Sequence, residues 1–223
     1  MNCRWLALFI LLFGIVVATA AGPATKVEPT GACTNPDFSD AIKGALQPQG
    51  LRISNDDGVL CEIWLAKTLQ QAAGSTGTDY NSLIPGSFAG VIVYPGKAGD
   101  YRGHAIPGAA YTMRYETMPA DGNHMGVAPT QDFFLLALGS ADQDPAAVFD
   151  YDALVGLSRK ASKTNHPAPL YLTSPTPGSG SAFHDTGDGH WAVEAKTKAK
   201  AKSGSAEIDF PLAIVLVGKG ESN

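Results

Sequence analysis

The chain has 223 residues, of which 44% are hydrophobic and 17% are charged, and it contains 25 Gly and 15 Pro. This composition is typical of a globular protein rich in turns, and it argues against a disordered tail, a coiled coil or a collagen-like repeat. With 16 basic and 21 acidic residues the formal net charge is -5. The basic surface that sequence-independent nucleic-acid binding requires is therefore missing, and we expect no nucleic-acid partner.

The amino terminus has the pattern of a secretory signal peptide. Arg4 precedes an apolar run over residues 5–17, and small residues follow at 18–21. This combination predicts export and cleavage after Ala20, so that residues 1–20 are removed. The alternative is an uncleaved membrane anchor. A spanning helix needs about 20 apolar residues, whereas residues 5–21 provide 17 and contain a cleavage site. We expect no transmembrane span in the mature protein.

Two cysteines remain after this cleavage, Cys33 and Cys61. Because disulfides form and persist outside the cytoplasm, the sequence predicts a bridge between them. The bridge would tie residues 21–50, an extended segment rich in Gly and Pro, to the strand that carries Cys61. In the chain-entropy model a loop of this size stabilises the fold by about 3–4 kcal/mol. The alternative is a buried thiol at Cys61 and a free Cys33 on a flexible arm.

Residues 110–118 show the clearest strand pattern in the chain. Alternate side chains form two faces, one with Tyr111, Met113 and Tyr115 and the other with Thr112, Arg114 and Glu116. A half-buried antiparallel strand buries the first set and leaves the second more exposed. A Pro-Gly turn at 107–108 predicts a hairpin that pairs residues 101–106 with 110–118. Further strands are expected at residues 59–66, 88–94, 133–138, 170–172, 191–195 and 208–217.

Just before this strand, residues 103–113 (GHAIPGAAYTM) resemble the strand entry of secreted bacterial β-sandwich families, including carboxypeptidase-regulatory-like domains. The pattern in those families is Pro, two small residues, Tyr, Thr and an apolar residue. Here the spacing departs by one residue between Ile106 and Tyr111. The resemblance covers about a dozen residues and implies a sandwich with a binding or structural role.

One helix is predicted over residues 150–162. Asp150 is a suitable N-cap, Leu154, Leu157 and Ala161 form an apolar stripe, and basic residues follow toward the carboxyl end. About eight short strands and one helix predict a mainly β fold, an antiparallel β-sandwich with a lateral helix. We expect residues 51–223 to form this single domain.

Two histidines near the carboxyl end are the first candidate metal ligands. In the run HDTGDGH, His184 and His190 flank five residues typical of a turn. If those residues form a hairpin loop, the two imidazoles face each other across the strands and can bind Zn²⁺ or Cu²⁺, with Asp188 as a third ligand. His104 and His124 are further candidates for a third ligand. The alternative is ordinary turn chemistry with two exposed histidines.

Four lysines then alternate along one predicted strand, namely Lys196, Lys198, Lys200 and Lys202. A row of positive charges on one face suggests an acidic polymer as a partner. The alternative is that these charges keep an edge strand from pairing with another chain.

These patterns favour an exported, soluble β-sandwich protein of structural or ligand-binding character. The sequence contains neither a Gly-x-Ser-x-Gly elbow nor a His-Glu-x-x-His motif, which argues against catalysis without deciding it. The alternative is a metal-dependent periplasmic enzyme that uses His184 and His190. No cofactor other than that divalent metal is expected.

Overall fold

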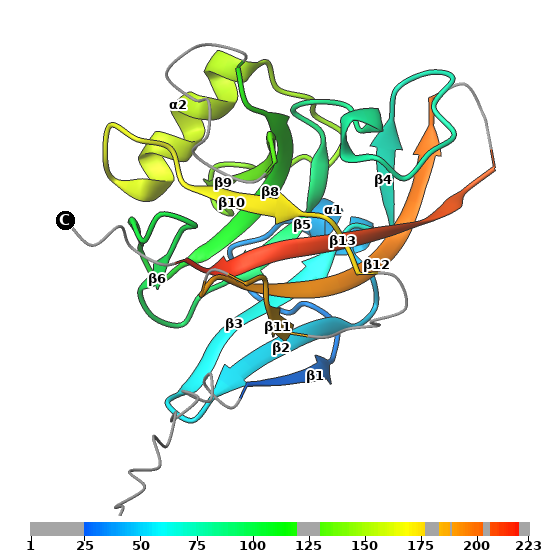
Figure 1. Ribbon diagram of the computed structural model, residues 1–223. Helices are drawn as coiled ribbons and strands as arrows, with labels where there is room; N and C mark the ends of the chain where they lie inside the picture. Colours follow the sequence, from blue (N-terminus) through cyan, green and yellow to red (C-terminus); the bar gives the residue numbers. More distant parts are fainter. Residues whose placement is uncertain (1–24, 120–129, 177–182, 188, 203–205, 219–223) are drawn as a thin grey trace, which may run out of the picture.

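The chain forms one large, strongly curled β-sheet with a helix on its outer face (Figure 1). The structure is a computed structural model that describes residues 25–119, 130–176, 183–187, 189–202 and 206–218. Strands make up 46% of it and helices 12%, which confirms the mainly β class. The sheet has the form of a half-barrel, and the predicted β-sandwich is not confirmed.

Within the described residues, the large sheet has eleven strands. Ten follow one another in the order β1 (Lys26–Thr30), β2 (Gly50–Asn55), β3 (Gly58–Leu65), β5 (Phe88–Val93), β8 (Ala110–Thr117), β9 (Asp132–Leu138), β10 (Pro169–Thr173), β13 (Ile208–Val217), β12 (Trp191–Ala201) and β11 (Phe183–Asp185). All of these neighbours pair antiparallel. The eleventh strand, β4 (Thr68–Gln71), pairs with β12 in parallel.

The curl of the sheet follows from the continuity of β3 and β4. β3 pairs with β5, and the chain then runs directly into β4, which lies beside β12. Between the two strands, the Ala66 carbonyl accepts a hydrogen bond from the Thr197 hydroxyl of β12. Strands β12 and β13 therefore cross over β3 and β5 (Figure 1), and the buried core lies between them.

The remaining elements are short, except for one helix. They are α1 (Asp40–Ala45), the 3-10 helix η1 (Tyr80–Ser82), α2 (Tyr151–Ser162) and a two-stranded ribbon of β6 (Ala98–Gly99) and β7 (Ala105–Ile106). Since β7 pairs with β6, the predicted hairpin between residues 101–106 and β8 is wrong. Neither α1 nor α2 is long and apolar enough to cross a membrane.

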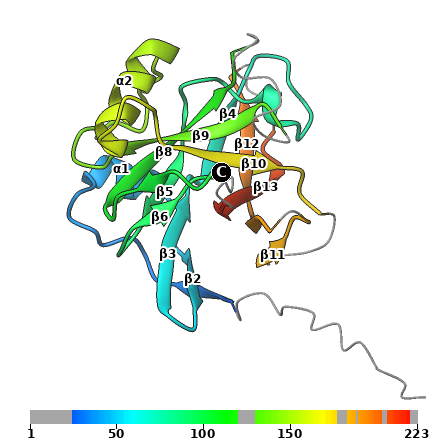
Figure 2. The ribbon, with the colours of Figure 1, turned by 60° about the vertical axis from the view of Figure 1, so that its left-hand side comes forward.

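Helix α2 confirms the predicted lateral helix at residues 150–162. The Asp150 carboxylate caps it by accepting a hydrogen bond from the Ala153 amide at 2.8 Å. Its apolar side packs over β8, β9 and β10 (Figure 2), where Leu154 and Val155 meet Phe133 in a separate outer cluster. The sheet is thus covered on both faces in this region.

That cover explains why one expectation for β8 is wrong. Tyr111, Met113 and Tyr115 are buried, as predicted, but Thr112, Arg114 and Glu116 are buried as well. The sequence pattern treats the second face as open to solvent. In the structure, residues 139–150 and α2 lie over it, so polar side chains of this face find their partners inside the protein.

Arg114 is the centre of that buried polar contact. Its Nε lies 2.8 Å from Asp142 Oδ2 and its Nη2 lies 2.6 Å from Asp142 Oδ1. The same guanidinium donates to the carbonyls of Asp144 and Ala147, and it lies over the Phe149 ring at 4.8 Å from the ring centroid. This network fixes the segment that leads into α2.

The predicted disulfide is absent, because Cys33 and Cys61 are both buried free thiols. Side chains alternate along β3, so Cys61 points to the face opposite Trp64. The Trp64 indole donates to the Gly31 carbonyl at 2.8 Å, which lays the segment carrying Cys33 over the Trp64 face. The strand therefore separates the two thiols, and burial raises the pKa of each.

The amino-terminal segment contributes to this core. Residues 25–50 contain β1, which pairs with β2, and α1, which buries Ile42. Phe38 and Leu46 flank α1 and are also buried. The proposed signal segment and its cleavage point at Ala20 lie outside the described residues.

Candidate metal centre

The structure does not place His184 opposite His190. In the β11–β12 pair, His184 lies opposite Ala192. The Thr186 amide donates to the His190 carbonyl at 2.8 Å, so the reversal is shorter than the five residues assumed from the sequence. His184 instead has its Nε2 at 3.6 Å from Glu194 Oε1. The cross-strand histidine pair is therefore wrong, and its proposed third ligand, Asp188, lies outside the described residues.

His190 has a packing role beside the ribbon of β6 and β7. Its ring stacks on Tyr101 with 3.9 Å between the centroids and 3° between the planes. Its Nε2 is 3.1 Å from the Tyr101 carbonyl oxygen, and the residue is buried. His190 thus supports the backbone of the loop that begins at Asp100.

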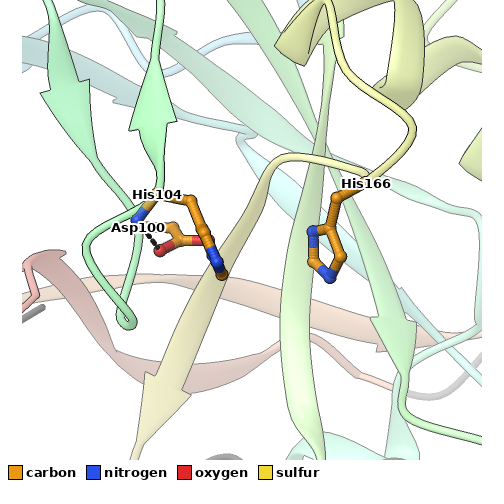
Figure 3. Close-up of side chains that lie close together, drawn as sticks. All are labelled: Asp100, His104 and His166. Carbon is orange, nitrogen blue, oxygen red and sulfur yellow. Dashed lines mark hydrogen bonds and ion pairs between the residues drawn. The ribbon is translucent and has the colours of Figure 1, made fainter. Parts of the chain in front are cut away.

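That loop takes part in a different group of three metal-binding side chains, Asp100, His104 and His166 (Figure 3). Each offers one ligand atom, and the three atoms lie within 4.8 Å of one another. In the part of the chain that the structure describes, no other set of His, Cys, Asp and Glu side chains meets this condition. His104 was a candidate third ligand in the sequence, whereas His124 lies outside the described residues.

The turn between β6 and β7 builds one side of the group. Asp100 is buried, and its Oδ1 accepts hydrogen bonds from the amides of Arg102 at 2.9 Å and His104 at 2.8 Å. Its Oδ2 lies 3.0 Å from Nδ1 of the His104 ring. Gly103 has a φ of 79°, which few residues other than glycine adopt, and this closes the turn. Asp100 therefore holds the exposed His104 ring in place.

The loop after α2 builds the other side. α2 ends at Ser162, and the next residue, Lys163, has a φ of 59° that turns the chain back toward the sheet. The hydroxyls of Ser162 and Thr164 donate to the His166 carbonyl at 2.6 and 2.9 Å. The His166 Nδ1 lies 2.8 Å from the Pro167 carbonyl oxygen. Because a carbonyl only accepts, this bond places the proton on Nδ1 and leaves the Nε2 lone pair for a ligand.

The two loops bring the imidazoles of His104 and His166 to 5.4 Å between ring centroids. Figure 3 shows the two rings side by side, with the Asp100 carboxylate next to His104. They line an open cleft of about 390 Å³ together with Ile106 and Pro167. Both imidazoles are exposed, so a ligand can reach them from solvent.

Two imidazoles and a carboxylate suit Zn²⁺ or Cu²⁺. Ligand atoms about 2.1 Å from one zinc ion lie at most about 4.2 Å apart. The observed limit of 4.8 Å is slightly larger, so the ligand atoms must approach one another by up to about 0.6 Å to hold one zinc ion. Ligating histidines commonly donate their second ring nitrogen to a carboxylate or a backbone carbonyl. His166 has such a contact, to the Pro167 carbonyl, whereas His104 Nδ1 and Asp100 Oδ2 lie 3.0 Å apart as two ligand atoms of the group.

The four lysines of the predicted acidic-polymer surface, Lys196, Lys198, Lys200 and Lys202, are all exposed. Between residues 198 and 201, however, β12 has β4 on one side, and β13 lies on the other side at 198 and 199. Lys198 therefore does not lie on an edge strand, and the alternative that its charge keeps such a strand from pairing with another chain is wrong. Its ammonium pairs with Asp209 at 2.5 Å, and this contact raises the pKa of Lys198. Binding of an acidic polymer stays a prediction.

Comparison with known proteins gives no relative for this chain. It matches no protein-family model, and neither a curated protein nor a solved structure matches it. The resemblance of residues 103–113 to secreted sandwich families is thus neither supported nor opposed by a relative. The evidence on function comes from the geometry of the chain itself.

Proposed function

We propose that this protein is exported and that its folded domain binds one divalent transition-metal ion, Zn²⁺ or Cu²⁺, through Asp100, His104 and His166. Export is supported by the signal pattern of residues 1–20. The ligand-binding character expected from the sequence is kept, but the metal site moves away from His184 and His190. We also propose that the curled sheet acts as the two facing layers of the predicted β-sandwich. The crossing of β12 and β13 over β3 and β5 supports this.

The observation that carries the proposal is the convergence of three ligand atoms within 4.8 Å. They come from two loops that are far apart in the sequence, and hydrogen bonds fix each loop independently. Among the described residues, His166 has its Nδ1 on the Pro167 carbonyl and keeps Nε2 for another contact, while His104 Nδ1 and Asp100 Oδ2 face each other at 3.0 Å. A shared cation explains why two exposed histidines and a buried carboxylate lie together.

A metal-dependent enzyme is the second candidate, and the cleft favours it. Three protein ligands leave one coordination position of a tetrahedral zinc ion for water, and such water ionises near pH 7. The cleft of about 390 Å³ next to His104 and His166 gives a substrate access to that position. Hydrolysis is the reaction class that this arrangement suits.

Metal analysis of the mature, untagged protein tests the proposal. We expect one equivalent of Zn²⁺ or Cu²⁺ after dialysis, and much less in the His166→Ala variant, which should fold normally because His166 is exposed. His184→Ala is the matched control, since His184 also lies beside a carboxylate but outside the group. Equal metal content in all three proteins would contradict the metal site. Amino-terminal sequencing that returns Met1 from the exported material would contradict the processing.

A further inference from the structure

Three spaces at the protein surface meet at His166 and Pro167. The first is the metal-binding cleft of about 390 Å³, which also contains Asp100 and His104. The second is an open groove of about 350 Å³ along α2, and the third is a narrow hollow of about 40 Å³ where α2 lies over β9 and β10 (Figure 2). Because His166 and Pro167 line all three, a molecule bound at the metal centre lies next to the groove and the hollow.

The narrow hollow has apolar and aromatic walls. They come mainly from α2, β9 and β10, through Tyr151, Val155, Phe133, Leu135, Pro169 and Tyr171. None of the described residues that line the hollow is Asp, Glu, Lys or Arg. Burial raises the pKa of Tyr171 to about 12, so its hydroxyl carries no charge at neutral pH. An apolar group therefore suits the hollow, whereas a charged group would lose its hydration there without a counter-charge.

Tyr151 lies where the hollow opens to solvent. It lines both the hollow and the groove along α2. The residue is 37% exposed, and among the described residues only Val59 and Val148 are large apolar residues with a higher exposed fraction. Val155, which also lines both spaces, is buried. The entrance to the hollow is thus an exposed aromatic side chain next to a buried apolar wall.

The volume of the hollow limits the group that can enter it. A water molecule occupies about 30 Å³ of the liquid, so a space of about 40 Å³ accepts one or two carbon atoms. The methyl groups at the end of a branched aliphatic chain have this size, whereas an aromatic ring is too large. The wider groove along α2 leaves room for the rest of a molecule.

The metal centre supplies the polar end of the site. Zinc held by three protein ligands keeps one position for an oxygen donor, and such an ion polarises a carbonyl group. His166 is one of the three ligands and also part of the wall of the hollow. A carbonyl oxygen at the open position therefore brings its own chain beside the His166 ring, where the hollow begins.

We propose that the metal centre binds amides or esters of short, branched aliphatic acids, with the carbonyl oxygen toward the metal and the end of the chain in the hollow beneath α2. This inference rests on the metal site proposed above and adds the class of molecule that the site takes. The hollow selects the acyl chain, and the groove along α2 receives the remainder of the molecule.

Three hydroxamates with the same metal-binding group test the selection. Acetohydroxamate ends in a methyl group. In 4-methylpentanohydroxamate two methylene groups lead to an isopropyl group, and in succinate monohydroxamate two methylene groups lead to a carboxylate of similar shape. Each is titrated by calorimetry into the full mature protein loaded with one equivalent of Zn²⁺. 4-Methylpentanohydroxamate should bind about tenfold more tightly than acetohydroxamate, because each buried carbon strengthens binding about fourfold. Succinate monohydroxamate should bind no more tightly than acetohydroxamate.

Two exposed apolar side chains provide matched variants. Tyr151→Ala removes part of the entrance and should reduce the tenfold preference to about threefold. Val148→Ala should leave the preference unchanged, because Val148 is 45% exposed and lines none of the three spaces. Acetohydroxamate should bind both variants as it binds the unchanged protein, which shows that the metal centre is intact.

The zinc content of each protein is measured before the titrations. Equal binding of acetohydroxamate and 4-methylpentanohydroxamate to the zinc-loaded protein, tighter binding of succinate monohydroxamate, or equal effects of Tyr151→Ala and Val148→Ala would overturn this inference and leave the metal site standing. A protein that retains no zinc after dialysis would overturn the metal site and this inference together.

Discussion

Replacing Asp142 by Asn tests whether the buried ion pair beneath α2 holds the outer layer in place. Asp142 accepts hydrogen bonds from Arg114 Nε at 2.8 Å, Arg114 Nη2 at 2.6 Å and the Thr112 hydroxyl at 2.6 Å. The side chains of Arg114 and Asp142 are 0% and 1% exposed. An Asn at this position turns an acceptor into an NH₂ group that faces a donor, and it leaves the guanidinium charge buried without compensation.

Breaking a buried ion pair by removing one charge costs about 3–5 kcal/mol. For a chain of this size each kcal/mol lowers Tm by about 2–4 °C, so the expected decrease is about 6–20 °C. Urea unfolding at pH 7, followed by tryptophan fluorescence, measures the loss of free energy, and a thermal scan measures the decrease in Tm. In contrast, the double variant Arg114→Met/Asp142→Leu should recover most of the stability, because hydrophobic replacement of both partners removes the unpaired charge.

The control is an exposed pair of the same chemistry. Arg52 lies 2.7 Å from Glu62, but their side chains are 48% and 23% exposed. Glu62→Gln should cost less than about 1 kcal/mol, since solvent screens such a pair. If Asp142→Asn were as mild as Glu62→Gln, the reasoning about the buried network would be refuted.

Three further predictions concern buried groups. Burial raises the pKa of the Glu116 carboxyl above its ordinary value of 4.5, so the folded state binds the carboxyl proton more tightly than the unfolded state does. Stability is therefore lost as the pH rises from the unfolded to the folded pKa. Glu116→Gln should stabilise the protein at pH 7 but not below pH 4, and a gain that does not depend on pH would contradict this. Gly218→Ala would place a Cβ 1.8 Å from the Asp100 carbonyl, so it should cost about 1–3 kcal/mol and weaken zinc binding in a titration, whereas Gly156→Ala in open space should not. Thiol titration of the mature, unreduced protein in urea should find two free cysteines, while finding none would restore the disulfide.

The sequence predicted the elements whose signals are local. Helix α2 follows from the Asp150 cap and its apolar stripe, and the core face of β8 follows from the alternation of three apolar side chains. The other face of β8 could not be predicted, because its cover comes from residues 139–150. The alternation of apolar and polar residues shows which face of a strand is apolar. It cannot show that Arg114, on the polar face, is buried against the carboxylate of Asp142.

The candidate site was missed for the same reason. Asp100 and His104 are four residues apart, and this spacing could have indicated a pair in a turn. His166, however, follows 62 positions later and reaches them only because α2 folds over the sheet. The spacing of His184 and His190 suggested that the two side chains face each other across a hairpin. The hydrogen bond from the Thr186 amide to the His190 carbonyl sets a different register, in which His184 lies opposite Ala192.

Anomalous diffraction from crystals of the mature protein loaded with Zn²⁺ tests the central claim most directly. The account predicts one anomalous peak between His104 and His166, about 2.0–2.1 Å from one ring nitrogen of each and at a similar distance from an Asp100 oxygen. No peak should lie between His184 and His190. A peak at any other side chains, or no ordered zinc at Asp100, His104 and His166, would contradict the account.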